Sequence, residues 1–446
     1  MAAAIAFSAC GGKASLPADD ALASATTLRN GTPGPIQHVI VVIQENRSFN
    51  DLFATFPSAD GTTHGVMETP SGDQNITLTK MRLASKCDFN HEYEAYVADY
   101  DGGKMDGFSL EPSSGSCGNK SLAPYQYVDP KDVEPYWSLA EQYVLGDHLF
   151  QTQGSGSFTA HQDLVAGATT IDPAKTRSLV DFPRQKPWGC DAPPQTRTSL
   201  LVAVGSKLEY ERNKGPFPCL TYATIRDLLD ARGVSWKYYS EPIIGGTGAT
   251  WNPFEAIKAV RYSAEWESKI TTSDKQIFND ISAGQLPQVS WVIPDSQNSD
   301  HPSQHSDTGP SWVASVVNAI GESRYWNSSA IVILWDDWGG FYDAVPPPFL
   351  DQWGGLGFRV PLIVVSPYAR SGYVSHTRYE FGSILRFIEG TFNLGTLGTT
   401  DERAASIGDC FNFQKKQPRA FKHIRAKYPL TFFEDQRPSN EPVDTQ

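Results

Sequence analysis

Residues 37–53 read QHVIVVIQENRSFNDLF and join a run of β-branched residues to a strongly polar cluster. The run 38–43, HVIVVI, is short and continuously apolar, which is typical of a strand buried on both faces of a sheet. Glu45 and Asn46 follow almost at once. Because ligands of parallel sheets collect at the carboxyl ends of strands, these two polar residues stand where a site would be.

Three more segments have the same apolar, β-branched character, at 289–293, 330–335 and 360–366. Apolar residues at helical spacing predict helices at 224–233, 311–323 and 381–392. Continuous apolar strands alternating with helices predict an α/β fold with long loop insertions. Its central sheet would be mainly parallel and covered by helices on both faces.

The length of 446 residues is ample for one large core, and the formal net charge is −13. This acidic balance argues against binding nucleic acid or an anionic membrane as the main role. We expect one domain over 36–433, preceded by a small, polar tether and followed by a polar tail at 434–446.

The first residues, MAAAIAFSACGG, resemble the end of a bacterial lipoprotein signal with Cys10 as the lipidated residue, although the basic region that opens such signals is missing. We therefore expect residues 1–35 to be a signal remnant and tether. The protein would be exported to the periplasm, the outer surface or the medium, with lipidated Cys10 as one form of membrane tether. The alternative is a disordered, alanine-rich leader.

Five further cysteines lie in the chain, and two pairs of them, Cys87 with Cys117 and Cys190 with Cys219, are each about 30 residues apart in Gly-, Pro- and Ser-rich segments. In an exported protein this pattern predicts two disulfides that staple loops, each contributing roughly 3–4 kcal/mol. Cys410 is left over. Other pairings stay open on the sequence alone.

A second strand end, in AIVILWDDWGG, carries Asp336 and Asp337 directly after an apolar run. Two adjacent carboxylates repel each other and are costly to bury. A divalent cation such as Ca²⁺, Mg²⁺, Mn²⁺ or Zn²⁺ would remove that conflict. The alternative is an exposed acidic turn, against which the flanking Trp335 and Trp338 argue.

The stretch 151–164, QTQGSGSFTAHQDL, would aim backbone N–H groups and the Ser157 hydroxyl at an anion, unless it is a flexible loop before a helix cap. His301 and His305 follow the strand predicted at 289–293, and His91 lies in an earlier polar block. A lone histidine is most often a surface residue. Loop histidines beside strand ends are nevertheless candidates for contacting phosphate oxygens or protonating a leaving group.

Six blocks, in order over about 36–415, resemble the bacterial phosphoesterase family that includes non-haemolytic phospholipase C and acid phosphatase A. They are QENRSFNDLF, HEYEAYVADYDGGKMDGF, GSGSFTAHQ, NSDHPS, WDDWGGFYDAVPPP and GFRVPLIVVSPYARSGYVSHTRYEFGSILRFIE. The resemblance implies an alkaline-phosphatase-like sheet and one divalent metal ion of open identity. The implied metal ligands are Glu45, Asn46, Ser157, Asp336 and Asp337. The implied catalytic residues are Ser157, His91 and His301, the two histidines also contacting the substrate, with His161 as a further substrate contact.

Three departures from the family pattern bear on the substrate. Ala344 stands where many relatives have histidine, and Tyr238 and Tyr239 stand near the place of a further histidine of the acid-phosphatase branch. The phospholipase branch tends to have threonine in the nucleophile turn, so Ser157 favours the phosphatase side.

We therefore expect an exported, metal-dependent hydrolase of phosphomonoesters that forms a phosphoserine. The alternative is a phospholipase C that cleaves phosphodiester head groups, and a non-catalytic surface binding protein is a more distant one. Small phosphoesters or phospholipids would be the partners, and no protein partner is inferred.

Overall fold

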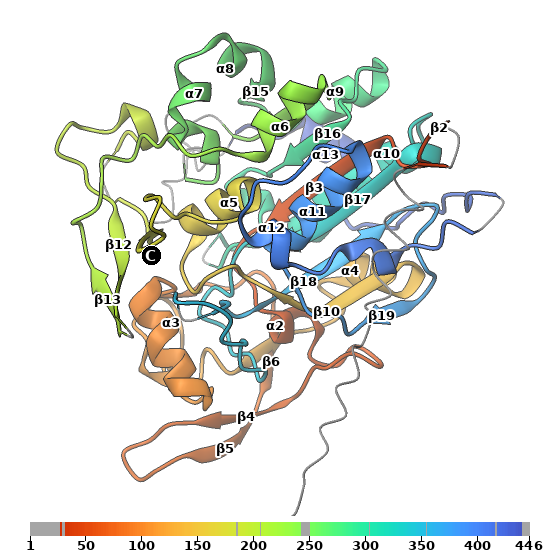
Figure 1. Ribbon diagram of the computed structural model, residues 1–446. Coiled ribbons are helices and arrows are strands. Elements are labelled where there is room, and N and C mark those ends of the chain that lie inside the picture. Colours follow the sequence, from red (N-terminus) through yellow and green to blue (C-terminus); the bar gives the residue numbers. More distant parts are fainter. Residues whose placement is uncertain are drawn as a thin grey trace, which may run out of the picture.

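The computed structural model describes residues 27–28, 32–183, 186–205, 207–241, 250–302, 304–353, 355–414 and 417–438. Cys10, nearly all of the predicted tether before 36 and most of the predicted tail lie outside the described residues. The predicted α/β fold is confirmed: a large central sheet is flanked by helices (Figure 1).

The four predicted strands form the middle of this sheet, in the order β16 (Val289–Val292), β3 (His38–Gln44), β17 (Ser329–Trp335) and β18 (Arg359–Val365). β3 is parallel to both of its neighbours. Every residue of β17 and β18 is buried, which explains their unbroken apolar sequence. β18 runs antiparallel to β17 because the chain between them turns back without a crossover helix.

The outer strands extend the sheet on both sides. Beyond β16 lie β14 (Trp236–Tyr239) and β15 (Ile270–Thr271), which are parallel to it. Beyond β18 lies β10 (Val144–Phe150), antiparallel to β18, and then β19 (Tyr373–Ser375) and β20 (Tyr379–Glu380), both parallel to β10. Most strand pairs are thus parallel, as predicted.

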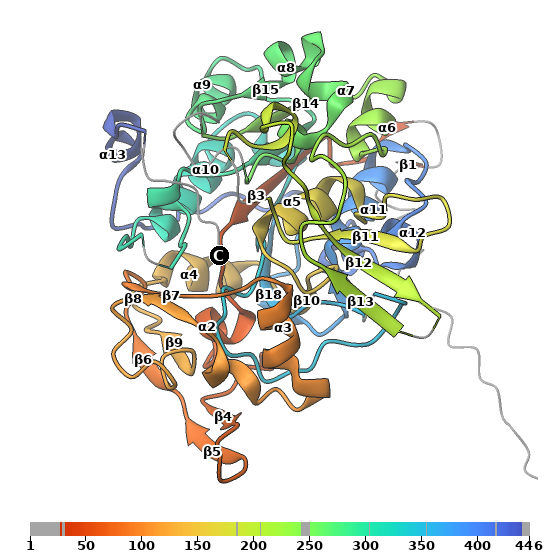
Figure 2. The same ribbon diagram turned by 90° about the vertical axis from the view of Figure 1, so that its left-hand side faces the viewer.

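Helices cover both faces of the sheet (Figure 2). One layer contains α4 (Glu134–Gln142), α9 (Gln276–Ser282), α10 (Gly309–Gly321) and α13 (Leu430–Asp435), which pack around α10. The other contains α5 (Ser157–Ala166), α6 (Ile225–Arg232), α11 (Phe381–Phe392) and α12 (Thr400–Arg403). The three predicted helices correspond to α6, α10 and α11.

Loop insertions carry the remaining elements and both disulfides. Cys87 is bonded to Cys117 and Cys190 to Cys219, so the predicted pairs are confirmed, and Cys410 is a buried thiol. Within the described residues, no helix combines the length and apolar character that crossing a bilayer requires. The smaller helices and strands are β1 (Thr27–Leu28), β2 (Thr32–Pro33), α2 (Phe49–Phe53), β4 (His64–Met67), β5 (Gln74–Thr77), β6 (Thr79–Met81), β7 (Cys87–Phe89), α3 (Tyr93–Tyr100), β8 (Ser113–Gly115), β9 (Gln126–Val128), β11 (Arg177–Val180), β12 (Ser199–Val204), β13 (Lys207–Glu211), α7 (Lys258–Arg261) and α8 (Ala264–Lys269).

Candidate active site

The central strands β3 and β17 end side by side, and this brings the two predicted acidic clusters together. Their parallel register pairs Gln44 with Trp335. The next residues therefore leave the sheet at one edge, where the Asn46 N–H donates to the Asp336 carboxylate at 3.1 Å. The side chains of Glu45, Asn46, Asp336 and Asp337 are fully buried. This burial rules out an exposed acidic turn.

The glycine after Trp338 lets the β17 turn approach Asn46 closely. Gly339 has a φ of +61°, and a Cβ atom there would lie 2.2 Å from the Asn46 carbonyl oxygen. Its N–H donates to Asp337 Oδ1 at 2.8 Å. A side chain at 339 would thus push Asp337 away from Asn46.

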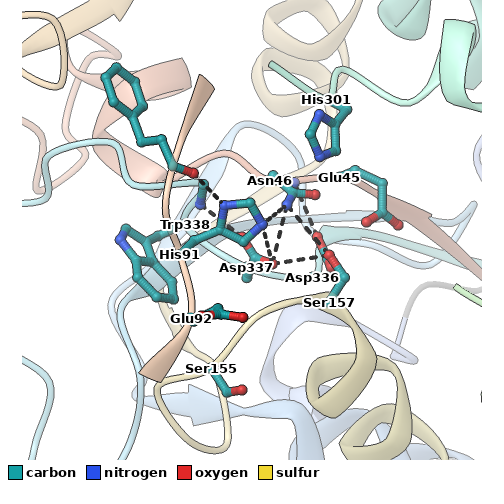
Figure 3. A network of polar contacts seen from close by, with 12 residues as sticks. Glu45, Asn46, His91, Glu92, Ser155, Ser157, His301, Asp336, Asp337 and Trp338 are labelled. Atoms are coloured by element: carbon teal, nitrogen blue, oxygen red, sulfur yellow. Dashed lines mark hydrogen bonds and ion pairs between the residues drawn. The ribbon is translucent and has the colours of Figure 1, made fainter. Parts of the chain in front are cut away.

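Ser157 reaches the same cluster from the first turn of α5, which confirms that the Gly/Ser-rich stretch leads into a helix. Its hydroxyl donates to Asp337 Oδ2 at 3.2 Å. The Asn46 amide nitrogen lies 3.4 Å from Ser157 Oγ and 3.3 Å from Asp337 Oδ2 (Figure 3). Three segments that are distant in sequence therefore converge on one hydroxyl.

His161 lies one helical turn after Ser157 and so faces the same way. Its Nε2 donates to Glu45 Oε1 at 2.9 Å and lies 3.8 Å from Asp336 Oδ2. Burial lowers the pKa of His161 to about 4, so its imidazole is neutral at neutral pH. His161 therefore lies among the buried carboxylates, and its contact with a substrate stays a prediction.

His91 and His301 approach Asn46 from two different directions (Figure 3). His91 donates from Nδ1 to the Phe89 carbonyl at 2.8 Å, and its Nε2 lies 2.8 Å from the Asn46 amide nitrogen and 4.0 Å from Asp337 Oδ2. The rings of His91 and His301 are 6.2 Å apart, and Trp251 stacks on His301 at 6.1 Å. Both predicted histidines therefore border the cluster.

The acidic cluster has unused oxygen ligands. Among the described residues, Glu45 Oε2, Asn46 Oδ1 and Asp336 Oδ2 make no hydrogen bond although they are buried. Burial, with repulsion from Asp336, raises the pKa of Glu45 well above its usual value and that of Asp337 to about 8. One ligand atom from each of Glu45, His161 and Asp336 lies within 4.8 Å of the others. Buried, unpartnered hard oxygens of this kind fit a divalent cation.

Arg47 has a structural role that the sequence did not reveal. It is fully buried, donates to Asp51 Oδ2 at 3.1 Å and to the Asp300 carbonyl at 2.9 Å, and stacks over Phe341 at 4.6 Å. Because Asp300 precedes His301, Arg47 ties the loops after β3, β16 and β17 to one another. The polar cluster after β3 thus combines two site residues with one positioning residue.

Two other polar candidates lie apart from the cluster. His305 is exposed, and the Tyr239 hydroxyl donates to Asp280 at 2.7 Å. Tyr238 is buried beside the site, where its hydroxyl donates to the Trp251 carbonyl at 2.6 Å and lies 3.4 Å from His161 Nδ1. Tyr238 therefore contacts two residues that border the cluster.

A nucleophile-type hydroxyl, paired carboxylates and flanking histidines at the carboxyl end of a mainly parallel sheet define an α/β enzyme of the hydrolase class. The chain belongs to the Phosphoesterase family, whose model matches residues 36–395. It is therefore a hydrolase that acts on phosphoester bonds.

Curated relatives of the chain are phospholipases C. Phospholipase C B of Mycobacterium tuberculosis (strain H37Rv) is 25% identical over 435 residues, covering 85% of this chain and 78% of the relative. The hemolytic phospholipase C of Pseudomonas aeruginosa is 25% identical over 461 residues, covering 88% of this chain but 58% of the relative. Non-specific phospholipase C1 of Arabidopsis thaliana is 25% identical over 409 residues, covering 81% and 68%.

Solved structures that align with this chain include a protein of the alkaline phosphatase superfamily from Vibrio parahaemolyticus. It has a TM-score of 0.36 at 10% identity and covers 86% of this chain and 76% of that one. The lipoteichoic acid synthase LtaP from Listeria monocytogenes has a TM-score of 0.39 at 10% identity, with coverage of 87% and 81%.

Proposed function

We propose that the chain hydrolyses phosphoesters through a phosphoserine at Ser157, next to one divalent cation bound by Glu45, Asn46, Asp336 and Asp337. The observation that carries this proposal is that the Ser157 hydroxyl bonds to Asp337 in the same cluster as buried oxygens of Glu45, Asn46 and Asp336. These three oxygens have no hydrogen-bond partner among the described residues. When bound, such a cation would lower the pKa of the serine hydroxyl and neutralise charge on the transferred phosphoryl group.

The protein's own groups hold the hydroxyl and the phosphoryl group. Asp337 accepts a hydrogen bond from the Ser157 hydroxyl, which directs an oxygen lone pair towards the substrate. Ser157 also begins α5, so the positive end of this helix faces the phosphoryl oxygens. His91, fixed through Nδ1 on Phe89, accepts a hydrogen bond from the Asn46 amide at Nε2. When protonated, Nε2 would exchange this contact for one with a phosphoryl oxygen.

The reaction takes two displacements. Ser157 passes its proton to Asp337 as Oγ forms a bond to phosphorus and the ester P–O bond breaks. The leaving oxygen takes a proton from His301, whose Nδ1 bonds to the Pro302 carbonyl. Water then attacks the phosphoserine and gives a proton to His301, while the P–Oγ bond breaks and Ser157 Oγ takes its proton back from Asp337. The products are an alcohol and either phosphate or a phosphomonoester.

Phospholipid diesters are our first substrate proposal. The relatives reported above are phospholipases C, and they match more than four fifths of this chain. Phosphomonoesters are the second candidate, because Ser157 favours the phosphatase side of the family resemblance.

Export is also part of the proposal, since two disulfides are typical of a protein that folds in an oxidising compartment.

Two comparisons test the proposed substrate and the proposed nucleophile: one between two substrates and one between two serine variants. Purified protein with added divalent metal is given p-nitrophenyl phosphorylcholine and p-nitrophenyl phosphate, and a higher kcat/KM for the diester supports the first candidate. Ser157→Ala should abolish turnover of both. Ser155→Ala is the matched control, because this buried serine on the same loop bonds to Asp181 at 3.2 Å. Turnover by Ser157→Ala at the wild-type rate would contradict the nucleophile.

A further inference from the structure

A second cluster of possible metal ligands lies on β10, away from Ser157. Asp147 and His148 are neighbours in this strand, so regular pleating would send their side chains to opposite faces. The pairing of β10 with β18 shifts register between Gly146 and Leu149. At this irregularity His148 Nδ1 lies 2.7 Å from Asp147 Oδ1, so the local change in strand geometry brings both groups to one place.

Two other segments contribute to this cluster. His376, in the connection between β19 and β20, has Nδ1 2.7 Å from Asp147 Oδ2. Asp60, in the loop after α2, has Oδ2 3.2 Å from His148 Nε2. Asp147 is fully buried, whereas the side chains of His148 and His376 are 21% and 59% exposed. A cation can therefore reach the cluster from solvent.

The two nitrogens of His148 both face carboxylate oxygens, and this is the decisive feature. A neutral imidazole has one N–H and one lone pair, so it can donate to only one of Asp147 and Asp60. A cation between His148 and Asp147 resolves the conflict, and it must be either a second proton or a metal ion. With a metal on Nδ1, the Nε2–H remains for Asp60, which is the carboxylate–histidine–metal arrangement common at zinc sites.

The surrounding charges allow a dication. Arg359 donates to the backbone carbonyls of Asp60 and Asp147 and lies 4.0 Å from the Asp60 carboxylate. Its own charge is matched by Asp343 at 2.9 Å. The carboxylates of Asp60 and Asp147 therefore leave two negative charges for the cluster.

We propose that Asp147, His148 and His376 bind one zinc ion, with Asp60 orienting His148. Ligand atoms of the three residues lie within 4.8 Å of one another, and two imidazoles with one carboxylate suit zinc better than calcium or magnesium. The ion joins the strand β10 to the β19–β20 connection. It is separate from the cation of the candidate active site.

The test uses protein without a histidine tag, stripped by a chelator and titrated with ZnCl₂ in a calorimeter. Wild type should bind one equivalent more than His376→Ala, and zinc should raise the Tm of the wild type more than that of the variant. His423→Ala is the matched control, because His423 is 61% exposed and pairs with Glu322 at 2.6 Å. It should bind as much zinc as wild type.

The position of Asp60 provides a second readout. Asp60→Ala should weaken zinc binding at this site by about 10–100-fold, as expected for loss of an outer carboxylate. Equal zinc stoichiometry in wild type and His376→Ala would overturn the proposal, and a proton would then bridge His148 and Asp147. Phosphoesterase activity of His376→Ala, measured in parallel, keeps this result independent of the proposed function.

Discussion

The cluster at the ends of β3 and β17 and the cluster on β10 both gather acids and histidines, but they differ in burial. In the first, Glu45 Oε2, Asn46 Oδ1 and Asp336 Oδ2 are shielded from water and make no hydrogen bond among the described residues. In the second, both oxygens of Asp147 accept hydrogen bonds, and His376 is half exposed. We therefore expect a bound divalent cation to stabilise the first cluster more than the second.

The largest expected difference between the two clusters is the effect of losing their metal ion on phosphoester hydrolysis. We expect a strong chelator to abolish phosphoester hydrolysis, and one divalent ion to restore it. Asp337→Ala should lose roughly 10³-fold or more in kcat/KM, because Asp337 contacts the nucleophile and the charge stabilisation is lost with the ion.

His376→Ala, which changes only the β10 cluster, is the control and should keep hydrolysis within about two-fold of wild type, since it touches no reacting group. Hydrolysis by the chelated wild type at its full rate would contradict the assignment of the first cluster.

Substitution of Arg47 tests whether the loops around the first cluster depend on a buried ion pair. Arg47→Met should lower the free energy of unfolding by about 3–5 kcal/mol, because it leaves the buried Asp51 carboxylate without its partner. Arg82→Met is the control, since Arg82 pairs with Asp132 but is 72% exposed, and its urea midpoint should hardly change. If the urea midpoint of Arg47→Met lay as close to that of wild type as the midpoint of Arg82→Met, Arg47 would not hold these loops together.

The stability of metal-free protein should depend on pH through the same cluster. The raised pKa values of Glu45 and Asp337, about 8 for Asp337, mean that the folded state holds protons that the unfolded state releases. Their stabilisation is present at low pH and is lost as the pH rises through the folded pKa. His161, with its pKa lowered to about 4, has the opposite sign and destabilises only below about 6.5.

Above about pH 6.5 His161 no longer contributes, but Glu255 and Glu389, whose pKa values burial raises to about 8, titrate together with the cluster. Metal-bound protein and Asp337→Asn therefore identify the share of the cluster. In urea titrations we expect the free energy of unfolding of metal-free protein to fall from about pH 6.5 to 8. A divalent cation should make the fall smaller, and so should Asp337→Asn. A flat profile for the metal-free wild type would show that the carboxylates do not carry these shifts.

The sequence predicted the sheet and the site through the same feature, the burial of its central strands. Runs such as 38–43 and 330–335 are continuous because both faces are covered, and their ends carry Glu45 and Asp336. β10 was not predicted, because Asp147 and His148 interrupt its apolar run.

The contacts of Arg47 and His161 could not be predicted from the sequence, because they depend on how loops from distant strands fold over one another. The four-residue spacing of His161 from Ser157 places both on one face of α5, but this follows only once that helix is known.

The smallest expected effect concerns the two adjacent tyrosines of β14. Tyr238→Phe removes a hydroxyl that lies 3.4 Å from His161 Nδ1 and donates to Trp251, the residue stacked on His301. Losing one buried hydrogen bond of about 1 kcal/mol should lower kcat/KM by up to about five-fold, since His161 and Trp251 would be held less firmly. Tyr239→Phe is the matched control because its hydroxyl bonds to Asp280 on the helix α9, away from Ser157. Equal kcat/KM values for the two variants would show that Tyr238 only fills the core beneath the first cluster. A lower kcat/KM in Tyr238→Phe alone would show that the Tyr238 hydroxyl supports the residues of the first cluster.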